Sequence, residues 1–328
     1  MEDLGARLAA IAGTCPPPVP APVAVAVFAG DHGVLAEGVS PWPVEVTAQM
    51  VANFSAGGAA INVLARQVGA SVTVVDVGVA GDLSHLVGPS VSSGTGEGRG
   101  SGLLLAKVRP GTANLAEGPA MSRAEAIQAL DVGARVAAEL VEGGARCLVT
   151  GDMGIGNTTP SAALIAALTG EPARRVTGRG TGISEEAWET KVSVVQRALA
   201  RSGAGPQDPL GALAEVGGLE IGALAGFIVG GAAGGVPVVI DGVIACAAAL
   251  VAAHLVPESR GYCVAGHRSS EPGATVVLER LGLVPLLDLD LRLGEGTGAC
   301  LAVPILQAAA RILGEMATFD SAGVADKG

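Results

Sequence analysis

Aromatic side chains and positive charge are both scarce in this sequence. Only 2% of the 328 residues are aromatic, and 20 lysines and arginines are outnumbered by 31 aspartates and glutamates, which gives a formal net charge of −11. Proteins that bind nucleic acid usually carry a basic surface, and those that bind single strands also stack bases on aromatic rings. The composition therefore excludes a nucleic-acid partner.

Signals for metal sites and disulfides are also missing. The five cysteines, Cys15, Cys147, Cys246, Cys263 and Cys300, form no CxxC pair, and the four histidines form no cluster with metal-ligand spacing. Four of these cysteines lie in apolar runs, where buried free thiols are the ordinary interpretation. These features predict a protein of the reducing cytoplasm that holds no metal.

One apolar run has the length of a membrane span, because Ile221–Ile240 contains no charged residue. It is interrupted by Gly234-Gly235-Val236-Pro237, which is typical of a turn. We therefore expect a helix, a turn and a buried strand here. The N-terminus lacks a basic region followed by an apolar core and a cleavage site, so we expect no signal peptide and no membrane association.

Glycine is abundant, with 50 residues, and most other apolar positions carry small aliphatic side chains. Apolar runs rich in β-branched residues, without polar alternation, indicate strands buried on both faces. Six such runs occur: Val23–Phe28, Ser71–Asp76, Arg146–Thr150, Val236–Ile240, Tyr262–Ala265 and Leu286–Leu289. Ala-rich stretches with helical spacing lie between them: Arg123–Val141, Ser161–Leu168, Glu185–Arg201 and Val243–Leu255. This alternation predicts an α/β fold, a doubly wound and mostly parallel sheet with helices on both faces.

We expect one α/β domain over residues 1–320, with a small helical part formed by residues from about 1–20 and 300–320. Two stretches, Pro16–Pro22 and Ser90–Gly102, are predicted to be flexible, and neither marks a domain boundary. The residues after Phe319, and with them the tail 321–328, are predicted to be disordered.

Glycines and carboxylates follow the predicted strands, and the carboxyl ends of parallel strands share one edge of the sheet. The run Gly154–Thr159 is the best candidate for an anion site there. Thr159 is a good N-cap and Pro160 a good first helical residue, so a helix N-terminus would face the ligand. A tight strand–helix turn without a ligand is the alternative interpretation.

A second glycine run, Gly178–Gly182, precedes a helix that Ser184 can cap. Lys191 lies within that helix and is one of only three lysines in an arginine-rich chain. A compact charge of this kind suits a phosphate. The alternative is a solvated surface lysine.

Glu295 lies between two glycines, just before a predicted helix over Ala299–Leu313. A carboxylate near a helix start has a lowered pKa, so a role as a base near neutral pH requires burial to raise the pKa again. The alternative is a glutamate that only stabilises the helix dipole. Asp241 follows a predicted strand, where a carboxylate commonly binds ribose hydroxyls. For Asp31-His32 we favour structural hydrogen bonding over acid–base or metal chemistry.

Seven motifs in this order resemble the nicotinate-nucleotide:dimethylbenzimidazole phosphoribosyltransferase family. They extend from FAGDHGV to RLGEGTGA, and the resemblance runs from about Glu2 to about Glu315. The motifs lie at Phe28–Val34, Glu45–Met50, Gly57–Ala65, Gly151–Pro160, the helix around Lys191, Val236–Gly242 and Arg292–Ala299.

The resemblance implies transfer of phosphoribose from nicotinate mononucleotide to dimethylbenzimidazole, giving α-ribazole phosphate and nicotinate in cobalamin biosynthesis. It also implies a homodimer with sites near the subunit interface, and no metal or redox cofactor. The family's catalytic glutamate falls on Glu295. Its second carboxylate, usually a glutamate, falls on Asp152, which is one methylene shorter.

These implications complete the expected site. Glu295 and Asp152 are expected to be catalytic, and Trp42, Met50 and Leu293 to form an apolar wall around the acceptor base. The other expected substrate-binding residues are Gly154, Gly156, Asn157, Thr158, Gly180, Lys191, Asp241 and Ser269. Two alternative functions stay open: the same transfer to another base, such as adenine, a simpler benzimidazole or a phenol, and nucleotide binding without catalysis.

Overall fold

The computed structural model describes residues 1–87, 102–180 and 182–325. Its centre is a sheet of six parallel strands in the order β3-β2-β1-β4-β5-β6. The strands are β1 (Val23–Gly30), β2 (Ser71–Gly78), β3 (Gly102–Leu105), β4 (Cys147–Met153), β5 (Val238–Ile240) and β6 (Cys263–Ala265). The order reverses between β1 and β4, so the predicted doubly wound sheet is confirmed.

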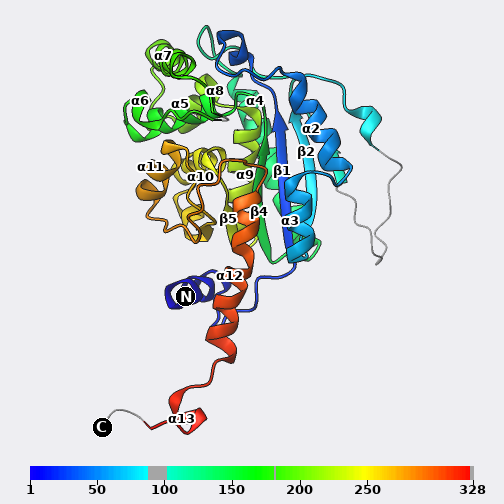
Figure 1. The fold of residues 1–328 in the computed structure, drawn as a ribbon, viewed down its shortest axis with the longest axis vertical. Helices are drawn as coiled ribbons and strands as arrows, with labels where there is room; N and C mark the ends of the chain where they lie inside the picture. Colours follow the sequence, from blue (N-terminus) through cyan, green and yellow to red (C-terminus); the bar gives the residue numbers. More distant parts are fainter. Residues whose placement is uncertain (88–101, 181, 326–328) are drawn as a thin grey trace.

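Helices cover both faces of this sheet (Figure 1). One face carries α4 (Arg123–Glu142), α5 (Thr158–Thr169), α6 (Ala173–Val176), α7 (Glu185–Ser202), α8 (Pro209–Val216), α9 (Leu219–Ala233), α10 (Val243–Leu255) and α11 (Pro272–Leu281). The other carries α1 (Glu2–Ala12), α2 (Glu45–Ser55), α3 (Ala60–Val68) and α12 (Thr297–Glu315). Short elements complete the described chain: η1 (Gly33–Glu37), η2 (Ser84–Leu86), η3 (Pro257–Tyr262) and α13 (Phe319–Ala322).

Two hydrophobic cores follow from the alternation of side chains along each strand. In β1, Ala26 and Phe28 face the core beneath α4, α9 and α10, whereas Val25 and Val27 face the core beneath α2, α3 and α12. All residues of β1 are buried. A strand buried on both faces favours apolar residues on both of its sides, which is why β1 forms a continuous apolar run in the sequence.

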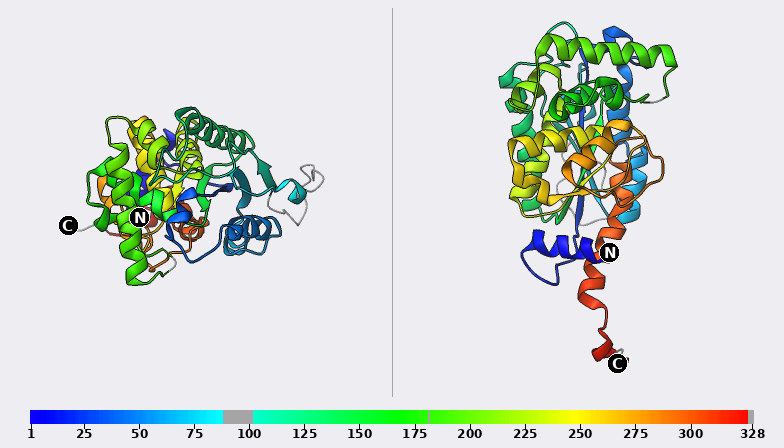
Figure 2. Two further views of the ribbon diagram at one scale, coloured as in Figure 1. Left: turned by 90° about the horizontal axis from the view of Figure 1, so that it is seen from above. Right: turned by 90° about the vertical axis from the view of Figure 1, so that its left-hand side faces the viewer.

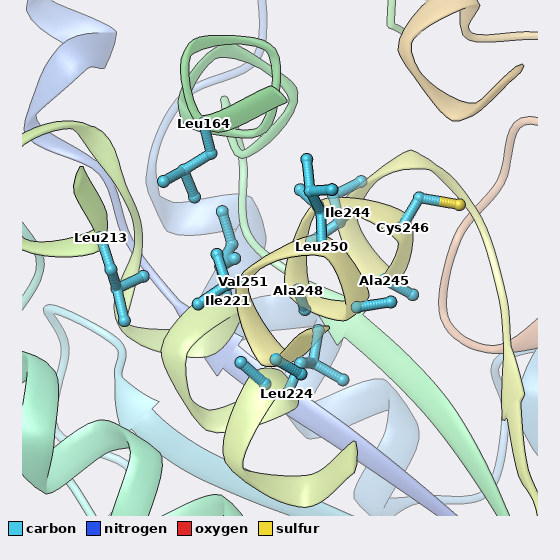
Figure 3. Packing of buried hydrophobic residues seen from close by; sticks show 14 of the residues in the cluster. Leu164, Leu213, Ile221, Leu224, Ile244, Ala245, Cys246, Ala248, Leu250 and Val251 are labelled. Carbon is cyan, nitrogen blue, oxygen red and sulfur yellow. The ribbon is translucent and has the colours of Figure 1, made fainter. Parts of the chain in front are cut away.

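Small residues let the helices of the first core approach closely. A methyl group on Gly133 of α4 would overlap the carbonyl oxygen of Ala223 on α9. Figure 3 shows the same dense packing between α9, through Ile221 and Leu224, and α10, through Val251. The segment read as a membrane-length run therefore divides into α9, a turn and β5, as predicted.

Several predicted boundaries are wrong. Leu286–Leu289 is no strand; it runs beside the end of β6 with an isolated bridge between His267 and Leu287. The strand β3 was not predicted, since its short GLLL run follows the glycine-rich stretch. The predicted N-cap Thr159 lies inside α5, whose N-cap is Asn157.

The first helix, α1, and the last long helix, α12, lie together on one side of the molecule (Figure 1). α1 packs against α12, with Gly5 next to the carbonyl oxygen of Ala309 (Figure 2). The predicted disorder after Phe319 is wrong for 320–322, which belong to α13 because the Thr318 hydroxyl caps this helix by accepting from the Ser321 N–H. The end of the predicted tail, 326–328, lies outside the described residues, as does most of the predicted flexible stretch Ser90–Gly102.

Among the described residues, one helix, α12, is apolar and long enough to cross a membrane by length and composition. Half of that stretch is buried within the protein, where it packs on α1 and α3.

Candidate functional site

A cavity of about 330 Å3 opens where the chain leaves β4, β5 and β6. This is the edge of the sheet at which doubly wound folds bind ligands. Residues from α2, α7 and the segments before α5 and α12 close its sides. Its polar and charged lining residues are Ser40, Asp152, Asn157, Thr158, Arg179, Lys191, His267, Ser269, Glu271, Arg292 and Glu295.

The structure brings together nearly all of the residues expected from the sequence. Every expected catalytic or substrate-binding residue lines this cavity except Asp241. They come from chain segments separated by up to about 250 positions, and the parallel sheet gathers several of them, such as those around Asp152 and Ser269, at the carboxyl ends of its strands.

One end of the cavity is suited to an anion. Gly154, Gly156 and Asn157 lie in the turn just before α5 and Thr158 is its first residue, so backbone N–H groups and the helix dipole favour negative charge here. Gly154 has no room for a side chain, because a Cβ there would overlap the carbonyl oxygen of Gly30. At Gly154 the cavity wall therefore consists of backbone atoms, because the close packing leaves no space for a side chain.

Lys191 adds a positive charge to the same end. Its ammonium group donates to the Thr158 hydroxyl at 2.8 Å and to the Gly178 carbonyl oxygen at 3.1 Å. The residue is 1% exposed, so the alternative of a solvated surface lysine is wrong. Burial lowers the pKa of Lys191 to about 8, against the opposing charge of Glu271.

Glu295 lies in a turn whose left-handed backbone favours glycine on both sides of it. Gly294, Glu295 and Gly296 all have positive φ, of 80°, 64° and 93°. A non-glycine residue in this region costs about 1–2 kcal/mol, and such strain concentrates at functional sites. The conformation lets the Glu295 carboxylate lie in the cavity wall while Gly296 becomes the N-cap of α12.

The environment of Glu295 raises its pKa above the ordinary value. Burial is the main cause, and the nearby charge of Asp241 adds to it. The hydrogen bond that Glu295 Oε2 accepts from the Ile61 N–H, at 3.3 Å, opposes the shift. The residue is 6% exposed. Burial thus offsets the helix-dipole effect, which is the condition that a base near neutral pH requires.

Asp152 forms a second buried carboxyl group in the wall. Burial raises the pKa of Asp152 to about 8, and the Asp241 charge adds to this shift. Its Oδ2 accepts a hydrogen bond from Asn157 Nδ2 at 3.0 Å, and its Oδ1 has no hydrogen-bond partner within the described part of the protein. A buried polar atom without a partner is costly, so Oδ1 is available to a ligand.

Asp241 lies beneath the site, not in its wall. Its two carboxylate oxygens accept hydrogen bonds from the Gly296 N–H at 3.1 Å and the Ala299 N–H at 2.8 Å. His267 Nε2 is 3.3 Å from Oδ1. Asp241 therefore caps α12 from β5 and holds the Glu295 turn, and nothing in its geometry supports the expected contact with ribose.

Another part of the cavity lining is apolar and more exposed. Trp42 is 52% exposed and Leu293 is 60% exposed, while Met50 is partly buried. Val39, Val46, Met153 and Ile155 line the cavity as well. This side can hold a flat apolar molecule.

Four charged or titratable lining residues were not predicted: Arg179, His267, Glu271 and Arg292. Each follows a predicted strand or borders a glycine run, so the position at the sheet edge was the available signal. Desolvation alone would lower the pKa of His267, but the hydrogen bond and charge of Asp241 outweigh it and raise the pKa.

The Asp31-His32 pair lies outside the cavity lining. His32 Nε2 is 2.9 Å from Glu220 Oε1, with both side chains fully buried, and Asp31 Oδ2 accepts from the Ala80 N–H at 2.7 Å. These contacts agree with the structural interpretation of the pair.

Known proteins resemble this chain over its whole length. The family described as phosphoribosyltransferase matches residues 1–324. A nicotinate-nucleotide–dimethylbenzimidazole phosphoribosyltransferase of Salinispora tropica is 58% identical over 100% of this chain and 90% of its own length. The enzyme of that name from Chloroflexus aggregans is 53% identical over 100% of this chain and 88% of its own length.

Solved structures agree with these relatives. A crystal structure of the enzyme of that name from Thermus thermophilus has a TM-score of 0.90 and 51% identity, covering 99% of this chain and 92% of that one. A CobT structure from the same organism has a TM-score of 0.90 and 52% identity, covering 99% and 93%. This chain therefore belongs to the nicotinate-nucleotide–dimethylbenzimidazole phosphoribosyltransferase family.

Proposed function

We infer that the protein transfers 5-phosphoribose from nicotinate mononucleotide to dimethylbenzimidazole, which yields α-ribazole phosphate and nicotinate. The observation that carries this inference is the position of Glu295, a buried carboxylate in a left-handed turn, in the same cavity as the buried cation Lys191. One cavity thus supplies a base and an anion site, the two elements that this transfer needs.

We assign the phosphate of nicotinate mononucleotide to the end formed by Gly154, Gly156, Thr158, Gly180 and Lys191, which we call the donor half. The support is the start of α5 together with an ammonium group fixed by two hydrogen bonds. Asn157 and Ser269 lie in the same wall and offer hydrogen-bonding groups to the ribose.

We assign the base to the apolar side around Trp42, Met50 and Leu293, which we call the acceptor half. One nitrogen of dimethylbenzimidazole attacks C1′ of the ribose, and the bond from C1′ to nicotinate breaks, with its electron pair leaving on the nicotinate nitrogen. The proton on the other benzimidazole nitrogen passes to Glu295. Attack on the face opposite the leaving group inverts the anomeric carbon from β to α.

Asp152 is proposed to assist this displacement. At neutral pH its raised pKa keeps it largely protonated, so Oδ1 can donate a hydrogen bond to a substrate oxygen. In this form it contributes no negative charge to compete with the phosphate.

A direct assay tests the proposal. The protein is incubated with nicotinate mononucleotide and a panel of bases, including dimethylbenzimidazole, benzimidazole, adenine and a phenol, and the products are identified by mass. The expected product is α-ribazole phosphate, with Glu295→Gln as the control protein. Preferential transfer to adenine or to a phenol would replace the acceptor assigned here, and the absence of any transfer would leave only nucleotide binding.

We also propose that the protein is a homodimer of the cytoplasm. Support for the dimer comes from α12 and α13, which extend away from the sheet (Figures 1 and 2) and expose Leu313, Met316 and Phe319. Apolar side chains on a projecting helix suit burial against a second subunit. Light scattering should give twice the chain mass, and Met316→Asp with Phe319→Asp should reduce it; a wild-type monomer would contradict the proposal.

A further inference from the structure

Glu271 is a buried carboxylate to which the reaction gives no role. It is the N-cap residue of α11 and is 7% exposed, yet its side chain makes no capping bond to that helix. The side chain instead reaches the cavity wall. A carboxylate is seldom buried unless a partner compensates for the lost hydration, so its contacts indicate what it is for.

The first contact is with the glycine turn of the donor half. Glu271 Oε1 accepts a hydrogen bond from the Gly180 N–H at 2.7 Å, across 91 positions of sequence. The carboxylate also lies so close to Gly178 that a Cβ there would overlap it. The turn of residues 178–180 is therefore folded against this one side chain.

Lys191 binds the same turn at a different backbone group, the carbonyl oxygen of Gly178. Its ammonium group donates to the Gly178 carbonyl oxygen and, at the same time, to the Thr158 hydroxyl at the start of α5. The turn is thus fixed at one N–H by Glu271 and at one carbonyl oxygen by Lys191. Glu271 and Lys191 thus place a negative and a positive charge beside this turn in the cavity wall.

The charge of Glu271 also bears on Lys191 directly. Burial favours the neutral amine of Lys191, and the Glu271 carboxylate is the charge that opposes this effect. A neutral amine does not attract phosphate. The other charged or titratable groups lining the cavity are Asp152, Arg179, His267, Arg292 and Glu295.

We propose that Glu271 is a positioning residue for the donor: it fixes the Gly178–Gly180 turn and keeps Lys191 charged at the place where the phosphate binds. Glu271 acts through these partners and takes no part in the chemical step. The inference rests on the proposed function, because it assumes that the donor phosphate occupies this half of the cavity.

The test compares Glu271→Gln with the wild type in steady-state assays. Glutamine keeps an oxygen for the Gly180 N–H but removes the charge, so the KM for nicotinate mononucleotide should rise about tenfold. The KM for dimethylbenzimidazole should change less than about twofold, since that half of the site is untouched. Glu279→Gln, an exposed glutamate on the same helix, is the matched control and should behave as the wild type.

A purely structural role predicts a different result. It would lower the melting temperature and the amount of active enzyme without changing the two KM values unequally. The pH profile separates the roles further: the rise of the donor KM on the alkaline side should start at lower pH in Glu271→Gln, because Lys191 loses its proton more easily. An unchanged or lower donor KM in the folded variant would overturn the inference, the lower value meaning that the carboxylate only repels phosphate.

A double-mutant cycle separates the coupling between Glu271 and Lys191 from any general loss of stability that Glu271→Gln causes by itself. In a Lys191→Met background, Glu271→Gln should raise the donor KM less than about threefold, because the positive charge that the carboxylate supports is gone. Equal effects in both backgrounds would refute the coupling. Failure of the proposed function is distinguishable, since in that case the wild type itself would form no product from nicotinate mononucleotide.

Discussion

The donor half and the acceptor half of the cavity are built in different ways. In the donor half, Lys191 and Thr158 are tied together by hydrogen bonds, and Glu271 joins them through the glycine turn. In the acceptor half, Trp42 and Leu293 present apolar area and are more than half exposed. Recognition of a charged group needs fixed partners in a buried place, whereas recognition of an apolar ring mainly needs area.

This difference predicts unequal responses to substitution. Removing one charge in a buried, bonded cluster leaves its partners unsatisfied, which is costly. Trimming an open apolar wall loses only the area removed from water. Glu295 is the proposed base in the wall of the same cavity, so its substitution tests the reaction itself.

The largest effect is expected for Glu295→Gln, with turnover at least about a hundredfold lower, because the neutral amide cannot accept the proton from the base. Binding of nicotinate mononucleotide should be nearly unchanged, as measured by calorimetry without the acceptor. Near-normal turnover would remove Glu295 from the role of base.

Lys191→Ala should raise the KM for nicotinate mononucleotide on the order of tenfold or more, while the KM for dimethylbenzimidazole changes less. The wild type should show the same loss of affinity for nicotinate mononucleotide when the pH rises. The pKa of Lys191 is about 8, so its charge is present below that pH and is lost as pH rises through it. The donor KM should therefore increase as the pH rises from neutral to above that pKa. A loss confined to the acceptor would move Lys191 out of the donor half.

The acceptor half should discriminate by apolar area. Each buried methyl-sized group contributes about 0.8 kcal/mol, so two ring methyls should improve kcat/KM about tenfold over plain benzimidazole. Adenine should be worse, because an amine left unpaired against this wall costs on the order of 1–3 kcal/mol. Initial rates at limiting base concentration measure both.

Trp42→Ala is the control for that series. It should reduce the preference for the methylated base without changing the donor KM. Rates with adenine that equal or exceed those with dimethylbenzimidazole would show that the wall does not select by apolar area.

The smallest effect is expected for Asp152→Asn. Because the pKa of Asp152 is about 8, the wild-type residue is largely protonated at neutral pH, and asparagine resembles that form. The rate at neutral pH should fall less than about fivefold, and the difference between variant and wild type should change as the pH passes through that pKa. A uniform large loss at every pH would mean that Asp152 works as a carboxylate.

Much of this architecture follows from local sequence. Apolar runs such as Val23–Phe28 are typical of strands buried on both faces, and their alternation with helical stretches leaves few topologies. The glycines around Glu295 and at Gly154 locate the site, because close approach of backbone requires them. Short elements such as β3 carry too few residues to give a pattern, and Leu286–Leu289 resembles a strand although it makes only one bridge.

Long-range partners were decided by the tertiary structure alone. Sequence position made Asp241 a candidate for binding ribose, but folding turns its carboxylate toward the N–H groups of α12. Glu271 and Lys191, separated by 80 positions in the numbering, become opposite charges beside one turn. Which polar group is buried beside which other depends on the packing of whole helices, and no local pattern records it. The sequence determined the fold and the place of the site, whereas the partner of each charge, and hence its pKa, was determined by the packing around it.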